Sequence, residues 1–362
     1  MKPLPIVTRT IAFGLGAAGT LLLLELLLRV LPVFGGLYAA DPRPDWPIHT
    51  LIPNTRYTYS SGWNLQNVHE GRINNYGYLS PDDYQPGSGG IAVFGDSYIE
   101  SVMNDYDDTL QGELAKQLRA RRPVMNFGTA GAELPHYLGA AEWVASEFQP
   151  EWAVFLITAG DFTRGFKADP GYFYWNPGDD PPIAFKPEPH RSGLTKFVRS
   201  LALVRYLRGN LSFQPGNMLV WRRTVEPPRQ ECEPGVLSKD DEALLAGFVE
   251  HLPRTLKLPP ERVILVFDSD RKAIYAGRSQ QEALRCAARP MLANERLKEL
   301  ARARGMRVVD SYPVFDEYFR RHGLPVDRAP FDAHWNPTAH RLMAAEVARI
   351  IEPARVSQAD PG

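Results

Sequence analysis

The most continuous apolar run in the chain lies near its start. Residues 11–31 are almost wholly apolar or small, and only Glu25 and Arg29 interrupt them. As a helix, this run of about 21 residues would be about 31 Å long, which is enough to cross the hydrocarbon core of a bilayer. Glu25 and Arg29 are four residues apart, so they face the same side of such a helix and can pair. The pattern predicts a transmembrane helix.

Basic residues precede the apolar run, since Lys2 and Arg9 lie before it. This arrangement predicts a single-pass protein of the cytoplasmic (inner) membrane, with the bulk of the chain on the periplasmic or extracytoplasmic side. Two alternatives compete with the anchor. A cleaved signal peptide usually has a shorter apolar region, and a buried core helix does not usually follow a basic terminus with an unbroken apolar stretch.

Beyond the first helix, short apolar runs alternate with amphipathic segments of helical period. Strands of this kind alternating with helices imply an α/β fold in which helices cover both faces of a parallel sheet. The helix near residue 110 would be capped by Asp107 or Asp108. The pattern predicts strands at 91–94, 123–127, 152–158, 263–267 and 306–310, and helices at 109–120, 137–148, 280–304, 315–322 and 339–351.

The same pattern divides the chain into four parts. Residues 1–35 are the predicted anchor, and residues 36–87 form a tether that leads into irregular or short-strand structure. The α/β domain is expected at 88–352, interrupted at about 167–260 by proline-rich and polar stretches that hold one basic amphipathic helix, residues 194–207. This insertion would cap the site. A C-terminal tail at 353–362 completes the chain.

Charge and composition exclude several classes of function. With 41 basic and 42 acidic side chains the net charge is −1, so nothing favours nucleic acid as a partner. Cys232 and Cys286 lack metal-site spacing, and they are equally well explained as a disulfide or as two thiols. The sequence has no glycine-rich phosphate loop and no metal-ligand cluster, so neither a cofactor nor a metal is expected.

Candidate chemistry lies at the end of the first predicted strand of the sheet. Ser97 follows Gly95 and Asp96 there, and ligands of open parallel sheets bind outside the carboxyl ends of strands. A serine becomes a good nucleophile when a base takes its proton, and His334 is the candidate base, with Asp332 to orient its ring. An aspartate and a histidine two residues apart would need a loop conformation to interact. The competing interpretation makes Ser97 a simple helix cap.

Three blocks in this order resemble the SGNH (GDSL-type) hydrolase family, as a bacterial membrane-anchored member. They are residues 93–101, residues 126–131 and residues 332–340. The resemblance covers about residues 88–165 and 260–352, and it implies a three-layer α/β/α sandwich. It also implies that Ser97 is the nucleophile, with Asp332 and His334 as its partners, and that the N–H groups of Ser97 and Gly131 form the oxyanion hole.

One position departs from the family pattern. The family supplies an asparagine side chain to the oxyanion hole from its third block, and Gly160 stands at that position here. Loss of one oxyanion donor costs about 10²–10³ in rate. Four explanations are open: a slow enzyme, replacement of the donor by Thr158 or Asn336, use of the Gly160 N–H, or a degenerate site.

These features predict a serine esterase that acts outside the cytoplasmic membrane on an acylated small molecule, glycan or lipid. One alternative is a polysaccharide O-acetyltransferase with the same site, because residues 332–335 are also similar to alginate-type acetyltransferases. Another is a catalytically degenerate protein that binds glycan or assembles with a polysaccharide export system. Trp335 and His340 are expected to have packing roles.

Overall fold

The computed structural model describes residues 6–41, 48–119, 122–213, 235–285, 287–328 and 332–353. Cys232 and Cys286 both lie outside these ranges, and so do almost all of the predicted C-terminal tail and the first five residues. The two alternatives for the cysteines therefore stay predictions.

The centre of the domain is a five-stranded sheet in the order β4-β3-β5-β8-β9. Every neighbouring pair in it is parallel, and the interior strands are buried except for the first residue of β5, because helices lie on both faces. All five predicted strands are confirmed within a residue or so. They are β3 (Ile91–Gly95), β4 (Val124–Gly128), β5 (Trp152–Ile157), β8 (Val263–Phe267) and β9 (Arg307–Asp310).

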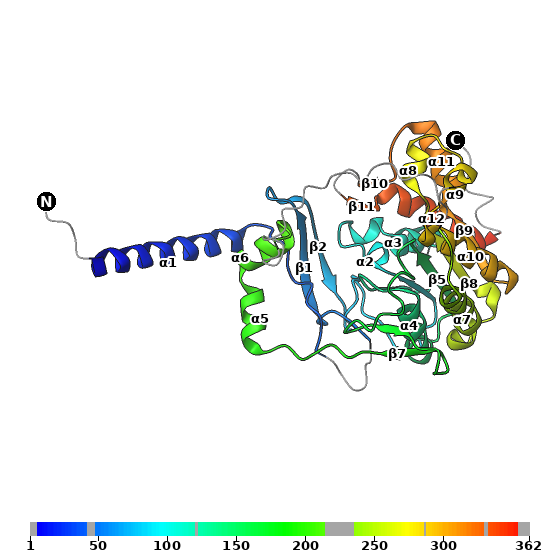
Figure 1. Cartoon of the computed structure of the whole chain (residues 1–362), viewed down its shortest axis with the longest axis horizontal. Helices are drawn as coiled ribbons and strands as arrows, with labels where there is room; N and C mark the ends of the chain where they lie inside the picture. The colour runs from blue at the N-terminus through cyan, green and yellow to red at the C-terminus, as the bar shows by residue number, and fades with distance from the viewer. Residues whose placement is uncertain are drawn as a thin grey trace.

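Two layers of helices enclose this sheet, which makes the predicted three-layer α/β/α sandwich (Figure 1). Alternate strand residues face opposite layers: Ala92 and Phe94 belong to one core, and Ile91 and Val93 to the other. The first core is closed by α4 (Leu134–Glu147), α7 (Lys239–Leu256) and α10 (Arg289–Ala303). The second is closed by α3 (Leu110–Gln117), α8 (Arg271–Tyr275), α11 (Ser311–His322) and α12 (Pro337–Ile351).

Some helix boundaries differ from the prediction for local reasons. Thr109, and not Asp107 or Asp108, caps α3, because its hydroxyl accepts the N–H of Gly112 at 3.3 Å. The expected helix at 280–304 is two helices, α9 (Gln280–Arg285) and α10, because proline in the first turn of α10 starts a new helix.

The stretch 167–260 is only partly an insertion. Its last third forms α7, whose apolar residues pack on the sheet as part of the sandwich. Before it lie β6 (Phe173–Trp175), β7 (Ile183–Phe185), α5 (Gly193–Ser200), α6 (Ala202–Arg205) and a π-helical turn, Tyr206–Asn210. The single helix expected at 194–207 is therefore wrong, because Leu201 has extended backbone (φ −63°, ψ 131°) and separates α5 from α6.

The leader before the sandwich contains an antiparallel hairpin, β1 (Thr55–Ser61) and β2 (Gln66–Ile73). The hairpin has a small core of its own, formed by Leu51, Tyr57, Ile73 and Leu79. This part of the chain is thus more ordered than a tether.

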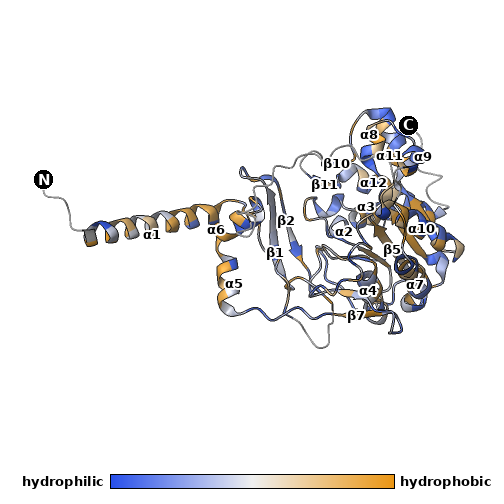
Figure 2. Cartoon of the chain, viewed as in Figure 1, coloured by the Kyte–Doolittle hydropathy of each residue, from blue (hydrophilic) through white to orange (hydrophobic). Residues whose placement is uncertain are grey.

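The N-terminal helix α1 (Ile6–Val30) projects from the domain (Figure 1), and Figure 2 shows it to be apolar along most of its length. Among the described residues, it is the one helix long and apolar enough to cross a membrane. None of its most apolar 18-residue window is buried in the protein. The core-helix alternative is therefore wrong, and α1 presents its apolar surface outward.

Candidate active site

The site lies where three neighbouring strands end. Strand β3 is the middle one of the three, with β4 on one side and β5 on the other. Because all three are parallel, the segments that follow them meet at the same edge of the sheet. Ser97 follows β3, Gly131 follows β4 and Gly160 follows β5. The topology therefore brings the three sequence blocks together, with Ser97 in the centre.

Ser97 is the first residue of a one-turn helix, α2 (Ser97–Glu100). Asp96 caps this helix by accepting the N–H of Tyr98 at 2.8 Å. The turn packs so closely that a Cβ on Gly95 would lie 2.4 Å from Cγ1 of Ile99. A Cβ on Gly128 would lie 2.2 Å from the backbone nitrogen of Glu100. Glycine at these two positions lets α2 sit directly on the ends of β3 and β4.

The structure brings the three predicted catalytic side chains together. The hydroxyl of Ser97 lies 2.7 Å from Nε2 of His334, and Nδ1 of His334 lies 2.5 Å from Oδ1 of Asp332. All three residues are half-buried, and all three line the same cavity. This chain of hydroxyl, imidazole and carboxylate is the arrangement in which a histidine can take the proton of a serine.

The carboxylate of Asp332 is held in its charged form. Burial opposes ionisation, but hydrogen bonds from the His334 ring and backbone N–H, together with the charges of His334 and Arg328, outweigh it and lower the Asp332 pKa. A carboxylate that stays ionised can orient the imidazole and stabilise the imidazolium that forms when Ser97 loses its proton.

The predicted loop at these residues is wrong. Residues Asp332–Trp335 form a short strand, β11, paired irregularly with β10 (Asp327–Arg328). Residues two apart in a strand face the same side, so Asp332 and His334 need no loop to meet.

A buried arginine fixes this strand in place. Arg271 donates to the carbonyl of Ala333 at 2.7 Å and to the hydroxyl of Tyr98 at 2.8 Å, and that hydroxyl donates to the same carbonyl. The guanidinium is paired with Asp268 at 2.8 Å and Asp327 at 3.2 Å. Arg271 thus connects the strand that carries His334 to the helix that carries Ser97.

The backbone donors expected for an oxyanion are available. Within the described residues, the N–H groups of Ser97 and Gly131 donate to no protein acceptor, whereas those of Thr129 and Ala132 do. Gly131 has φ +77°, a conformation that favours glycine. Unpaired N–H groups on adjoining strand ends are suited to stabilising a negatively charged oxygen.

The loop of Gly131 is held by Arg164, which follows β5, and by Tyr172 of the insertion. Arg164 donates to the Gly131 carbonyl at 3.3 Å and pairs with Glu133 at 3.0 Å. The hydroxyl of Tyr172 donates to the carbonyl of Ala130 at 2.6 Å. These contacts hold both carbonyls of the loop in place, and Tyr172 is itself part of the wall of the cavity at Ser97.

The third loop supplies no side-chain donor. The N–H of Gly160 donates to the Thr158 hydroxyl at 3.3 Å, and that hydroxyl donates to Asp161 at 2.5 Å. The Asn336 side chain caps α12 and donates to the carbonyls of Pro325 and Asp327. Thr158 and Asn336 are therefore both engaged elsewhere, and a role for the Gly160 N–H stays a prediction.

A cavity of about 510 Å³ opens onto Ser97. Its walls come from the catalytic strand ends, from the segment after α1 and from the insertion. Lining residues include Phe34, Leu37, His49, Tyr59, Ser97, Glu100, Tyr172, Arg191, Arg199, Asp332 and His334.

Glu100 places a titratable group in this cavity. Burial, reinforced by the charge of Asp96, raises the pKa of Glu100 to about 7, although the N–H of Ala130 bonds to the carboxylate and opposes the rise. A carboxyl group beside Ser97 therefore changes its charge near neutral pH.

His340 and Trp335 have the packing roles expected of them. Nδ1 of His340 accepts the N–H of Leu110 at 3.1 Å, and burial lowers the His340 pKa to about 3. Trp335 is fully buried, and its indole N–H donates to Asp268 at 2.8 Å. Within the described part of the chain, no group of three or more potential ligands is placed to hold a metal ion.

No protein-family model matches the chain, and no curated protein matches it. Among solved structures, a lipolytic protein of the G-D-S-L family from Veillonella parvula is 12% identical, with a TM-score of 0.36 over 74% of this chain and 98% of its own. An acetyl xylan esterase from Geobacillus stearothermophilus is 15% identical, with a TM-score of 0.40 over 74% and 96%. An alpha/beta hydrolase enzyme, LAE5, from the Lake Arreo metagenome is 17% identical, with a TM-score of 0.39 over 73% and 96%.

These structures include the family that the sequence motifs resemble, but their identities and TM-scores are low.

Several residues of the site carry no motif in the sequence. Arg271 and Asp268 come from the segment after β8, and Tyr172, Arg191 and Arg199 come from the insertion. The position of Asp268 directly after β8 could have indicated it, because polar residues at the carboxyl ends of parallel strands gather at one edge of the sheet. Nothing local indicates the insertion residues.

Proposed function

We propose that this protein is a serine esterase in which Ser97 attacks the carbonyl carbon of an ester. The observation that carries the proposal is the unbroken contact from Ser97 through His334 to Asp332, with distances of 2.7 and 2.5 Å. The unpaired N–H groups of Ser97 and Gly131 support it, because acyl transfer also requires donors that stabilise the oxyanion.

The reaction follows from these positions. His334 Nε2 takes the proton of the Ser97 hydroxyl as its oxygen bonds to the carbonyl carbon, and the carbonyl oxygen becomes an oxyanion between the two N–H groups. When the carbon–oxygen bond to the alcohol breaks, His334 gives that proton to the leaving oxygen. The acyl group stays on Ser97 until water, activated by His334, releases it as the acid.

The finer parts of the proposal concern substrate and place. We place the domain on the periplasmic or extracytoplasmic side of the cytoplasmic membrane, with α1 as a retained anchor. The last turns of α1 support retention, since Leu28 packs in a small core with Val33 and Ala202. The proposed substrate is an acylated glycan or lipid, and a polysaccharide-assembly system is the proposed setting.

Transfer to a sugar hydroxyl is the second form of the same chemistry. Both reactions share the acyl group on Ser97 and differ in the acceptor that His334 activates. Incubation of the enzyme with an acyl ester and a soluble oligosaccharide, with mass analysis of the products, separates the two. Free acid alone indicates hydrolysis, and an acylated oligosaccharide indicates transfer.

Labelling of the full chain in detergent with a fluorophosphonate probe tests the nucleophile. We expect labelling of the wild type, and loss of labelling in Ser97→Ala and His334→Ala. Ser101→Ala is a matched control, because Ser101 also lies beside a histidine, His340, but is buried away from the cavity. Labelling that persists in Ser97→Ala would exclude Ser97. An unlabelled wild type that hydrolyses no short acyl ester would favour the glycan-binding alternative.

A further inference from the structure

The short helix α5 is amphipathic, but its apolar face points to solvent and its charged face points toward the protein. Leu194, Phe197 and Val198 share one face by their spacing, and they are 73%, 61% and 41% exposed. On the opposite side, Lys196 and Arg199 point toward the protein. Arg199 is the one residue of α5 that is half-buried. A surface helix of a soluble domain normally buries its apolar face and exposes its charges.

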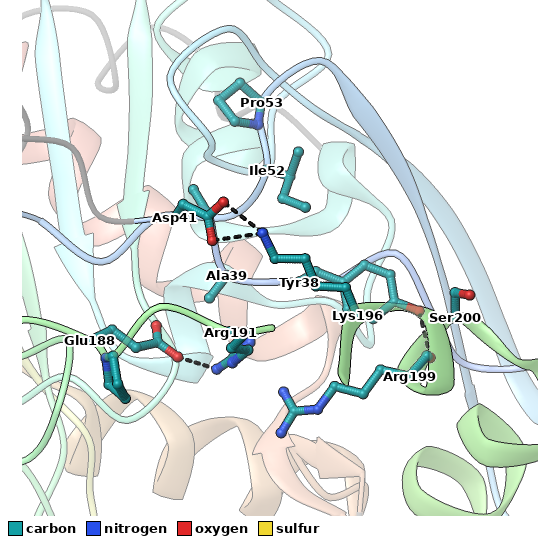
Figure 3. Close-up of a pocket in the computed structure, with 12 residues that line it drawn as sticks. Tyr38, Ala39, Asp41, Ile52, Pro53, Glu188, Arg191, Lys196, Arg199 and Ser200 are labelled. Atoms are coloured by element: carbon teal, nitrogen blue, oxygen red, sulfur yellow. Dashed lines mark hydrogen bonds and ion pairs between the residues drawn. The ribbon is translucent and has the colours of Figure 1, made fainter. Parts of the chain in front are cut away.

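The charged face of α5 closes a cavity of about 450 Å³ against the segment that follows α1 (Figure 3). Lys196 reaches across to the carboxylate of Asp41, with distances of 2.6 and 2.9 Å. The hydroxyl of Tyr38 donates to the carbonyl of Arg199 at 3.2 Å. These contacts fix the orientation of the helix, so its apolar face is held outward.

The start of α6 is fastened to α1 itself. Glu25 accepts the N–H groups of Ala202 at 3.0 Å and Leu203 at 2.9 Å, and it pairs with Arg29 at 2.8 Å. Glu25 of the apolar helix therefore caps α6. Further contacts join the same region, since Asn210 accepts the N–H of Phe34 at 3.1 Å.

Figure 1 shows how this junction is oriented. Helix α5 runs crosswise to α1, near the end where α1 joins the domain. If α1 crosses a bilayer along the membrane normal, α5 lies in the plane of the membrane surface. Figure 2 shows apolar residues on α5, on the side of the domain from which α1 leaves.

Other exposed apolar side chains gather around the same junction. Beyond Leu31, six of the eleven large hydrophobic residues that are exposed in the described chain belong to it. Trp63 is 75% exposed, and its carbonyl accepts the hydroxyl of Tyr206 next to α6 at 2.7 Å. Together they form what we call the interfacial patch: Trp63, Leu194, Phe197, Val198, Leu211 and Phe213.

We propose that the interfacial patch lies in the headgroup region of the bilayer that α1 crosses, with the apolar face of α5 inserted among the lipids. Outward apolar residues, a tryptophan at the boundary and a helix parallel to the surface are features of interfacial membrane segments. The attachment of α6 to Glu25 holds this part of the domain beside α1.

The proposal has a consequence for the cavity of Ser97. Arg199 of α5 and Phe34 and Leu37 after α1 line that cavity too. A helix is about 10–12 Å across, so one helix separates the cavity wall from the lipids. The ester-processing site would then face the membrane surface.

Photo-crosslinking of the full chain in nanodiscs of phosphatidylcholine and phosphatidylglycerol tests the proposal. Phe197 is replaced with the photoreactive residue p-benzoylphenylalanine, and lipid adducts are counted by mass spectrometry. Leu324 is a matched negative control, because it is 56% exposed and closely follows α11, the helix that lies on the far side of the domain from α1 in Figure 1. Leu15, in the exposed part of α1, is the positive control.

We expect at least ten times more lipid adduct at position 197 than at position 324, and an adduct at position 15. Equal yields at 197 and 324 would overturn the proposal. Crosslinks from position 197 to a second copy of the chain would also overturn it, since they assign the patch to self-association. Absence of adduct at both 15 and 197 counts against it as well, because α5 is held to the bilayer through α1. None of these readouts depends on esterase activity.

Discussion

Replacing Gly160 with asparagine tests whether the missing oxyanion donor limits this site. A Cβ at position 160 would meet only the Thr158 hydroxyl oxygen, at 3.6 Å, which is an ordinary van der Waals contact. Gly160 is also absent from the residues with positive φ, so an asparagine fits the backbone. The loop follows β5 directly beside the loop of Ser97, where the side-chain amide can add a third donor to two backbone N–H groups.

The expected gain is set by the value of one oxyanion donor. A donor in this position is worth about 10²–10³ in kcat, or about 3–4 kcal/mol. We expect about 10-fold to 100-fold for Gly160→Asn, because no neighbouring group is arranged to hold the new amide rigidly. The gain should appear in kcat with KM little changed, since the donor acts on the transition state and not on the bound ester.

Hydrolysis of p-nitrophenyl acetate by the full chain in detergent measures the effect. Gly160→Ala is the steric control, and it should leave kcat within about 2-fold because it adds the Cβ without a donor. Gly160→Asp has nearly the shape of asparagine but repels an oxyanion, so it should lower kcat. If Gly160→Asn is no faster than Gly160→Ala, the loop after β5 does not face the reacting carbonyl, and the reasoning fails.

Three further variants test other parts of the site. In the wild type, the pKa of Glu100 is raised from 4.5 to about 7, so the free energy of unfolding falls as pH rises between these values. Glu100→Gln should avoid this fall, which is worth about 3 kcal/mol at pH 8 in urea titrations, and should extend esterase activity to higher pH. Parallel pH profiles of the two proteins would refute the assignment. Arg271→Met removes the guanidinium that pairs with the buried carboxylates of Asp268 and Asp327, so it should cost about 3–5 kcal/mol of unfolding free energy, and a Tm unchanged from wild type would contradict this. Gly128→Ala drives a Cβ into the backbone of α2 and should lower fluorophosphonate labelling of Ser97 at least 10-fold, about 1.4 kcal/mol, whereas Gly178→Ala, which meets nothing within 4 Å, should have no effect.

The alternation of apolar runs with helical periods determined the sandwich. The strands are nearly unbroken apolar runs because both faces of the sheet are buried, so the sequence alone shows where they lie. The order of the strands then places the segments of Ser97 and Gly131 side by side, because β3 and β4 are parallel neighbours in the sheet. Gly160 was also visible in the sequence as a departure from the family pattern.

The sequence was less informative where a residue acts through a distant partner. Arg271 interacts with Ala333, more than 60 residues away, and no local pattern marks it as part of the site. Asp332 and His334 meet in a strand and not in a loop, because the irregular pairing of β10 with β11 is set by the surrounding fold.

The insertion shows the same limit most clearly. Sequence periodicity gave the amphipathic character of residues 194–198, since Leu194, Phe197 and Val198 share a face of any helix built there. It could not give the direction of that face. Contacts of Lys196 with Asp41 and of Glu25 with the start of α6 decide it. Local composition therefore determined which elements form, whereas packing between distant segments decided which way they face and what they line.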